Sequence, residues 1–346
     1  MSSSRRKAMN AYQRQLFGAQ TFLEYTLDHQ LSVEKKRLLI FDNVLVELWD
    51  NGVLYFHPQA VSSADSILLS VGVHGNETAP IEIVDRLVSD ILSGKTCLKH
   101  NLLVVIANPP AISASSREVD ENMNRLFNNQ LHKNHKASAE RLRSIDLMAY
   151  STDFFNRHAE HKFHYDLHTA IRDSAYEVFA ISPNISSASL VEQQYSTLAQ
   201  WGIEAILSTD KNNATYSAFT ARYCGAVSFT LELGQVKPFG ENDLNKLSAV
   251  ITGLDRLVSG CERHVTEAKK PRRFRVIAEV YKRSKDFQLC FPPATANFSE
   301  FSRGDLLAVD TDYQYRVACD GERILFPNEN VAIGQRTLVI VRPLDN

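Results

Sequence analysis

The sequence predicts an α/β protein with a mostly parallel mixed sheet, helices on both faces, and a small C-terminal all-β domain. Three observations lead to this prediction. The run at residues 66–75 is apolar without polar alternation, which is typical of a strand covered on both faces. Such runs alternate with segments of helical spacing, as they do around a parallel sheet. From residue 272 onward, short β-like runs follow one another without a helical pattern.

The elements can be assigned in order along the chain. The first 30 residues are polar with a weak apolar face and predict an N-terminal helical arm. Two apolar stretches separated by Asp50-Asn51-Gly52 predict a β-hairpin. Four buried strands and four helices should then alternate, starting with a strand. The expected strands are residues 66–75, 101–110, 163–171 and 226–234, and the expected helices are residues 78–94, 138–158, 187–202 and 241–260.

A basic, proline-containing segment at residues 269–273 separates the two patterns and is interpreted as a linker. We therefore expect an arm at residues 1–30, a catalytic α/β domain at 31–268 and a small β domain at 272–346. No internal repeat is apparent.

Composition restricts the class of protein. The 346 residues carry a net charge of −2, which gives no reason to expect nucleic acid or an anionic membrane as a partner. No apolar run is long enough for a membrane span, and the N-terminus lacks a secretory signal. The five cysteines are scattered, which argues against disulfides and thiolate zinc sites and favours the cytoplasm. Any metal would therefore need histidine and carboxylate ligands.

Histidine and glutamate side chains occur where three of the predicted strands end. His74 and Glu77 follow the first strand, and His168 lies at the end of the third. Ligands of open α/β sheets bind at the carboxyl ends of the strands, and two histidines with one glutamate form a known catalytic zinc set. These residues therefore predict a zinc ion held by His74, Glu77 and His168. Glu232, at the end of the fourth strand, remains as a general base toward an attacking water.

Other readings of these residues stay open. His-x-x-Glu occurs by chance in many chains, and Glu77 also suits the first turn of a helix. His158, His161 and His164 precede His168, but only His168 lies at the strand's carboxyl end. Asp166 should point to the same side as His168. It is interpreted either as a carboxylate that orients this ligand or as a structural hydrogen-bond partner.

Three arginines are candidates for binding a substrate anion. Arg117 and Arg125 follow the second strand, on the edge expected to hold the metal, and Arg222 precedes Glu232 by ten residues. A guanidinium can bind a carboxylate through two hydrogen bonds or stabilise an oxyanion. Surface exposure or ion pairing with nearby acids are the alternative interpretations.

Four motifs in order resemble the succinylglutamate desuccinylase family, in the aspartoacylase branch of the zinc carboxypeptidase-like fold. They are VGVHGNETAPIEIVDRL, ANPPA with the later NMNRLF, DLHTAIR, and FTLELGQVKPFGENDL. The resemblance covers residues 21 to 346.

The resemblance implies zinc ligands at His74, Glu77 and His168, and a catalytic glutamate at Glu232. It places the family's arginines at Arg117 and Arg125, beside Asn124. Its reaction is the hydrolysis of N-succinyl-L-glutamate, the last step of arginine degradation by the succinyltransferase pathway. The family often has Asp where this chain has Asn122. If that Asp orients Arg125, a neutral hydrogen bond replaces the salt bridge here.

These observations combine into one expected mechanism. One Zn²⁺ per subunit activates a water, Glu232 moves its proton, and Arg117 stabilises the oxyanion of the succinyl amide. Arg125, Asn124 and Arg222 are expected to contact the small-molecule substrate. Two alternatives remain: a related N-acyl-amino-acid amidohydrolase (aspartoacylase-like) or metallocarboxypeptidase, and a non-catalytic zinc-binding module. The sequence leaves a homo-oligomer open.

Overall fold

The computed structural model describes residues 10–29, 33–59, 65–128, 138–157, 161–183, 188–209, 213–261 and 268–344. Its helices are α1 (Ala11–Phe17), α2 (Phe22–Asp28), α3 (Thr78–Leu92), α4 (Pro109–Ser113), the 3₁₀ turn η1 (Met123–Arg125), α5 (Ala139–Arg157), α6 (Ala188–Gln200), α7 (Tyr216–Cys224) and α8 (Ser248–Val258). Its strands are β1 (Lys36–Ile40), β2 (Val44–Asp50), β3 (Val53–Pro58), β4 (Ser66–Val71), β5 (Asn101–Ile106), β6 (Lys162–Ala170), β7 (Val178–Pro183), β8 (Ala205–Thr209), β9 (Val227–Gln235), β10 (Arg272–Tyr281), β11 (Gln288–Leu289), β12 (Glu300–Phe301), β13 (Leu306–Asp310), β14 (Tyr313–Arg316), β15 (Glu322–Leu325) and β16 (Arg336–Pro343).

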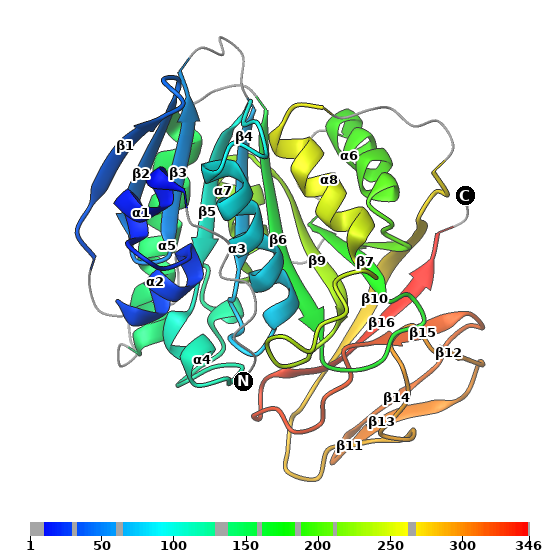
Figure 1. The fold of residues 1–346 in the computed structure, drawn as a ribbon. Coiled ribbons are helices and arrows are strands. Elements are labelled where there is room, and N and C mark those ends of the chain that lie inside the picture. Colours follow the sequence, from blue (N-terminus) through cyan, green and yellow to red (C-terminus); the bar gives the residue numbers. More distant parts are fainter. Residues whose placement is uncertain are drawn as a thin grey trace.

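Within these residues, one 13-stranded mixed sheet has the order β1-β2-β3-β5-β4-β6-β9-β7-β8-β10-β16-β15-β12 (Figure 1). The central strands β5, β4, β6 and β9 are mutually parallel, whereas β1, β2 and β3 form an antiparallel edge. Apolar side chains of α3, α6 and α8 pack on one face, and those of α5 and α7 pack on the other. The α/β prediction with helices on both faces is therefore confirmed.

Several elements differ from the sequence-based expectation. The hairpin at Asp50-Asn51-Gly52 is present, with Gly52 at φ 68°, but an additional strand, β1, precedes it. Strands β7 and β8 and helix α7 were not predicted. The last predicted helix begins only at Ser248. Pro109 and Pro110 open α4 instead of ending a strand, because proline suits the first helical turn and Asn108 caps it.

The N-terminal helices are part of the main core. Leu16 and Phe17 of α1 and Phe22 of α2 are buried against the apolar face that α3 also covers. Residues 1–9 of the predicted arm, like His158, lie outside the described residues.

Polar side chains occupy one face of the three central strands β4, β6 and β9. Their apolar residues, such as Leu69, Tyr165 and Phe229, belong to the core under α3 and α8. The alternate residues point to the α5 and α7 side, since side chains alternate along a strand. These alternate residues include Ser66, Ser70, His164, Asp166, His168, Ser228, Thr230 and Glu232, all of them buried. The face beneath α7 is therefore polar, and it leads to the carboxyl ends of the strands.

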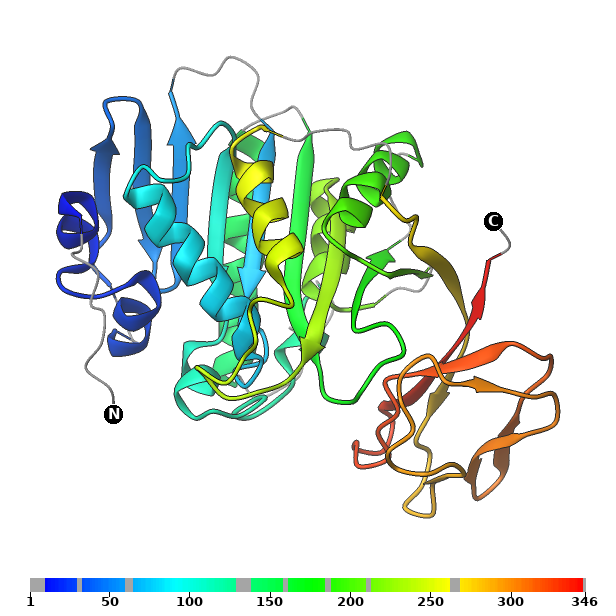
Figure 2. The ribbon, with the colours of Figure 1, turned by 45° about the vertical axis from the view of Figure 1, so that its right-hand side comes forward.

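Strand β10 connects the main sheet to the C-terminal part. Residues 272–275 pair in parallel with β8, and residues 274–281 pair with β16. The C-terminal strands lie beside the end of the sheet to which β6 and β9 point (Figure 2). Among the described residues, no helix has the length and apolar character needed to cross a membrane.

Candidate metal centre

Three elements bring the candidate ligands together. β4 ends at Val71, and the following loop carries His74 to Glu77, which is the residue before α3. β6 supplies His168, and Glu232 of β9 lies opposite it in parallel register. The loop needs glycine at position 75, because a Cβ there would lie 2.1 Å from the backbone carbon of Ala111 in α4.

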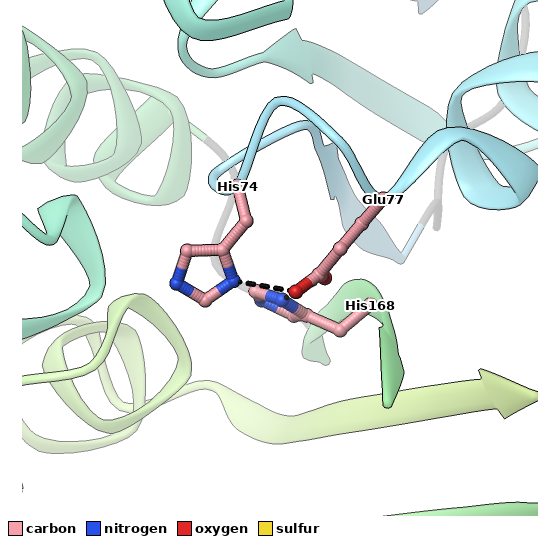
Figure 3. A group of neighbouring side chains, drawn as sticks. All are labelled: His74, Glu77 and His168. Atoms are coloured by element: carbon pink, nitrogen blue, oxygen red, sulfur yellow. Dashed lines mark hydrogen bonds and ion pairs between the residues drawn. The ribbon is translucent and has the colours of Figure 1, made fainter. Parts of the chain in front are cut away.

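The Glu77 carboxylate lies between the two histidines (Figure 3). Its Oε1 is 2.8 Å from His74 Nδ1, and its Oε2 is 2.8 Å from His168 Nδ1. The backbone N–H of Thr169 donates to the same Oε2 at 3.1 Å. Ligand atoms of the three residues lie within 4.8 Å of one another, and all three side chains are buried. The sequence-predicted group is thus assembled in the fold.

The second nitrogen of each imidazole faces an acceptor. His74 Nε2 is 3.1 Å from Asn122 Oδ1, and His168 Nε2 is 3.0 Å from Asp166 Oδ2. A histidine that donates Nε2–H in this way presents the lone pair of Nδ1 to a metal, and such partners are typical of metal-binding histidines. Asp166 therefore lies where a carboxylate that orients His168 would lie.

The charges around His168 favour a positive charge at this position. Burial by itself lowers the pKa of His168, but the charges of Asp166 and Glu77 outweigh it and raise the pKa well above its ordinary value. Burial likewise opposes ionisation of Glu77, yet the histidine charges bring its pKa well below the ordinary range. Without a metal, a proton on His168 Nδ1 supplies the positive charge. A divalent cation fits the same place, because its ligands are deprotonated when it binds.

Glu232 has the environment expected of a general base. Its Oε2 is buried without a hydrogen-bond partner among the residues that the structure describes. Burial raises its pKa to about 7, while the His168 charge acts in the opposite direction. A carboxyl group with a pKa near neutrality can both accept and return a proton. Glu232 is therefore suited to proton transfer, and it is not part of the candidate ligand group of His74, Glu77 and His168.

The arginines do not all lie at this site. Arg117 Nη1 donates to Glu77 Oε1 at 2.8 Å. Part of the Arg125 side chain is exposed to solvent. The surrounding protein atoms nevertheless lower its pKa to about 10 by desolvation, and the charges of Arg336 and Arg117 act in the same direction. Arg336 comes from β16 and donates to Glu279 of β10 at 2.8 Å. The C-terminal part thus places charged groups beside Arg125, which the sequence did not predict.

The prediction for Arg222 is wrong. Helix α7 begins beside the site, where the Tyr216 N–H donates to Asn124 Oδ1 at 3.0 Å. It ends at Cys224, whose carbonyl accepts from Lys162 at the amino end of β6. Arg222 lies in this last turn, and the length of β6 separates it from His168. Asn124 is buried near the site, but its side-chain oxygen Oδ1 already accepts the hydrogen bond from α7.

Position 122 has a different role from the one expected. The Asn122 side chain contacts His74 and the backbone N–H of Asn124, whereas Arg125 Nη1 bonds the backbone oxygen of Asn124. The departure from the family's Asp therefore concerns the candidate ligand His74 and not the orientation of Arg125. The contact could not be inferred from sequence, because 48 residues separate the two side chains.

We expect Asn122→Ala to weaken zinc binding about 10- to 100-fold, since His74 would lose the acceptor that fixes its tautomer. Asn122→Asp should instead strengthen it, because a carboxylate is the better acceptor. Competition of each purified variant with a chromophoric chelator measures the affinity. Equal affinities for the parent and both variants would contradict this role.

Comparisons with known proteins identify the family of the chain. The family described as the succinylglutamate desuccinylase/aspartoacylase catalytic domain matches residues 63–258. The AstE/AspA barrel-sandwich hybrid domain matches residues 269–344. The chain belongs to the succinylglutamate desuccinylase/aspartoacylase family. The resemblance noted from the four sequence motifs is thereby confirmed.

Relatives within the family match over almost the whole chain. A succinylglutamate desuccinylase of Idiomarina loihiensis is 39% identical over 92% of this chain and 95% of its own length. One from Burkholderia orbicola is 40% identical over 92% and 94%. The solved structure of a succinylglutamate desuccinylase from Vibrio parahaemolyticus has a TM-score of 0.86 at 32% identity, covering 94% of this chain and 96% of its own. That from Chromobacterium violaceum has a TM-score of 0.82 at 35% identity, covering 94% and 98%.

Proposed function

We propose that this protein hydrolyses N-succinyl-L-glutamate to succinate and L-glutamate, with one Zn²⁺ per subunit held by His74, Glu77 and His168. The observation that carries the proposal is the buried ligand group with Glu232 nearby, whose buried Oε2 has no hydrogen-bond partner among the described residues. Family membership supports the reaction, because relatives at 39% and 40% identity are named succinylglutamate desuccinylase. We propose that this hydrolysis is the last step of arginine degradation by the succinyltransferase pathway, since N-succinyl-L-glutamate is the substrate of that step.

When bound, the metal polarises the amide carbonyl and makes the attacking water more acidic. Glu232 accepts a proton from that water as the oxygen attacks the succinyl carbonyl carbon. The C–N bond then breaks, and Glu232 returns the proton to the departing nitrogen of glutamate. Asp166 and Asn122 keep the two histidines in the tautomer that leaves Nδ1 free.

The cationic side chains suit an anionic substrate. N-succinyl-L-glutamate carries three carboxylates. Arg117 contacts Glu77 of the ligand group, and Arg125 lies near enough to Arg117 for their charges to interact. Arg117 stabilises the oxyanion, and Arg125 binds a substrate carboxylate with Asn124 next to it. Arg336 is a further cation, positioned by Glu279. The proposed role of the β domain at residues 272–346 is to supply this side of the substrate site.

The alternatives predict different reactions. An aspartoacylase-like amidohydrolase or a carboxypeptidase would share the metal and the base but not the preference for a succinyl group. A non-catalytic zinc module has no need for a buried carboxylate such as Glu232. We propose a cytoplasmic enzyme, and the homo-oligomer stays a prediction.

Comparing substrates tests the function. We expect the zinc-loaded protein to release glutamate from N-succinyl-L-glutamate and the chelator-treated protein to release almost none. N-propionyl-L-glutamate lacks only the succinyl carboxylate. Loss of one charge-assisted hydrogen bond should lower its kcat/KM about 10- to 100-fold.

N-acetyl-L-aspartate distinguishes the aspartoacylase alternative. A higher kcat/KM for this compound would replace the proposed substrate by that of an aspartoacylase. Zinc binding without hydrolysis of any of the three amides would favour the non-catalytic module.

A further inference from the structure

A chain of hydrogen bonds runs beneath α7, from Asp166 away from the metal centre. It joins residues from four elements on the polar face of the sheet. Asp166 contacts Ser70 of β4, Ser70 contacts His164 of β6, and His164 contacts Thr220 of α7. Ser228 of β9 bonds Thr220 in turn. All five side chains are buried, so none of them is placed there to contact solvent.

The first part of the chain has only one possible direction. The Asp166 carboxylate accepts from His168 Nε2–H through Oδ2, and its Oδ1 lies 2.5 Å from the hydroxyl oxygen of Ser70. A carboxylate is an acceptor only, so Ser70 must donate its single proton to Asp166. The Ser70 oxygen is 2.8 Å from His164 Nε2 and can then only accept. His164 therefore carries a proton on Nε2.

The second part follows from the first. Burial lowers the pKa of His164 to about 4, so the ring is neutral and its Nδ1 carries a lone pair. That nitrogen accepts from the Thr220 hydroxyl at 2.7 Å, a shorter contact than those of the same hydroxyl to the backbone oxygens of Ser217 and Tyr216, at 3.1 and 3.4 Å. The Thr220 oxygen lies 2.9 Å from the Ser228 oxygen, whose proton can go to Thr220 or to the backbone oxygen of Ala226 at 3.3 Å. The protons of Thr220, His164 and Ser70 thus point toward Asp166.

We propose that Ser70 and His164 are positioning residues for the metal centre, which hold the Asp166 carboxylate against His168 Nε2 and so keep His168 Nδ1 available to the metal. The inference rests on the proposed metal site and extends it two residues further into the protein. Without the Ser70 hydrogen bond, Asp166 Oδ1 has no donor from this side, and the carboxylate is free to turn. His168 then loses the fixed tautomer that a metal ligand needs.

β4 provides a matched pair of variants. Ser70 and Ser66 lie on the same face of the same strand, and both are fully buried. Ser66 Oγ has no hydrogen-bond partner among the described residues. We expect Ser70→Ala to weaken zinc binding about tenfold in chelator competition, while Ser66→Ala keeps the parent's affinity.

Thr220→Val is the second variant, because valine keeps the shape of threonine and removes only the hydroxyl. His164 is then free to carry its proton on Nδ1 and to compete with Asp166 for the Ser70 proton. We expect weaker zinc binding together with a change of His164 tautomer, which ¹H–¹⁵N correlation spectra of the zinc-loaded protein report. If Ser70→Ala does not fold, Thr220→Val still tests whether the hydrogen-bond chain positions Asp166.

Two results would overturn the proposal. One is a Ser70→Ala or Thr220→Val protein that binds zinc as tightly as the parent. The other is a parent protein in which His164 carries its proton on Nδ1. Neither measurement uses a substrate, so a failure here is distinct from a failure of the proposed reaction.

Discussion

Glu232→Gln is expected to lower kcat for N-succinyl-L-glutamate about 10²- to 10⁴-fold while zinc remains bound. Glutamine has nearly the same shape but cannot accept the proton of the attacking water. The zinc content should stay at the parent's level, because the ligand group consists of His74, Glu77 and His168. Steady-state kinetics and elemental analysis of the same preparation measure the two quantities.

Glu241→Gln is the matched control, since this glutamate is exposed and lies nine residues further along the chain. It should behave like the parent. Near-parental activity of Glu232→Gln would show that another group moves the proton. Loss of zinc from that variant would instead show that Glu232 is a ligand.

The same variant also tests the environment of Glu232. The pKa is raised to about 7 from the ordinary 4.5, so the folded chain holds this proton more tightly than the unfolded chain does. The resulting stabilisation is present below about pH 4.5 and is lost as the pH rises through 7. Glutamine does not titrate. The Tm of the metal-free variant relative to that of the metal-free parent should therefore increase between pH 5 and pH 8.

His168→Ala is expected to remove the metal and with it nearly all activity. The variant retains only two of the three ligands and leaves Glu77 and Asp166 facing each other without the cation between them. A metal contributes several kcal/mol to stabilisation of the transition state, so we expect at least about a thousandfold loss in kcat/KM. Elemental analysis after dialysis measures the zinc, and hydrolysis of N-succinyl-L-glutamate measures the activity.

His161→Ala is the control for this substitution. His161 belongs to the same histidine-rich segment, but it is exposed and bonds Asp65. It should keep zinc and activity. Full zinc occupancy in His168→Ala would rule out His168 as a ligand.

The sequence predicted β4 and β5 because they are covered on both faces and are apolar over most of their length. It missed β7, β8 and α7, since residues 178–183 and 205–209 are short and α7 has only nine residues. Short apolar runs do not distinguish a strand from a buried helix. The polar alternation in β6 and β9 was present in the sequence, and it indicates which face of the sheet is polar.

The sequence by itself determined the candidate ligands and the base. His74 and Glu77 follow the end of β4, and His168 and Glu232 lie near the ends of β6 and β9. Parallel strands end at one edge of the sheet. Their convergence therefore follows from local patterns.

Only the tertiary structure decided which side chains orient these groups. Asn122 reaches His74 across 48 residues, and Ser70 reaches Asp166 across 96. Arg222, close to Glu232 in sequence, lies at the other end of α7. The physical reason is that hydrogen bonds depend on distances of about 3 Å between atoms. Strand order, register and helix packing set these distances, and no local pattern of the chain encodes them.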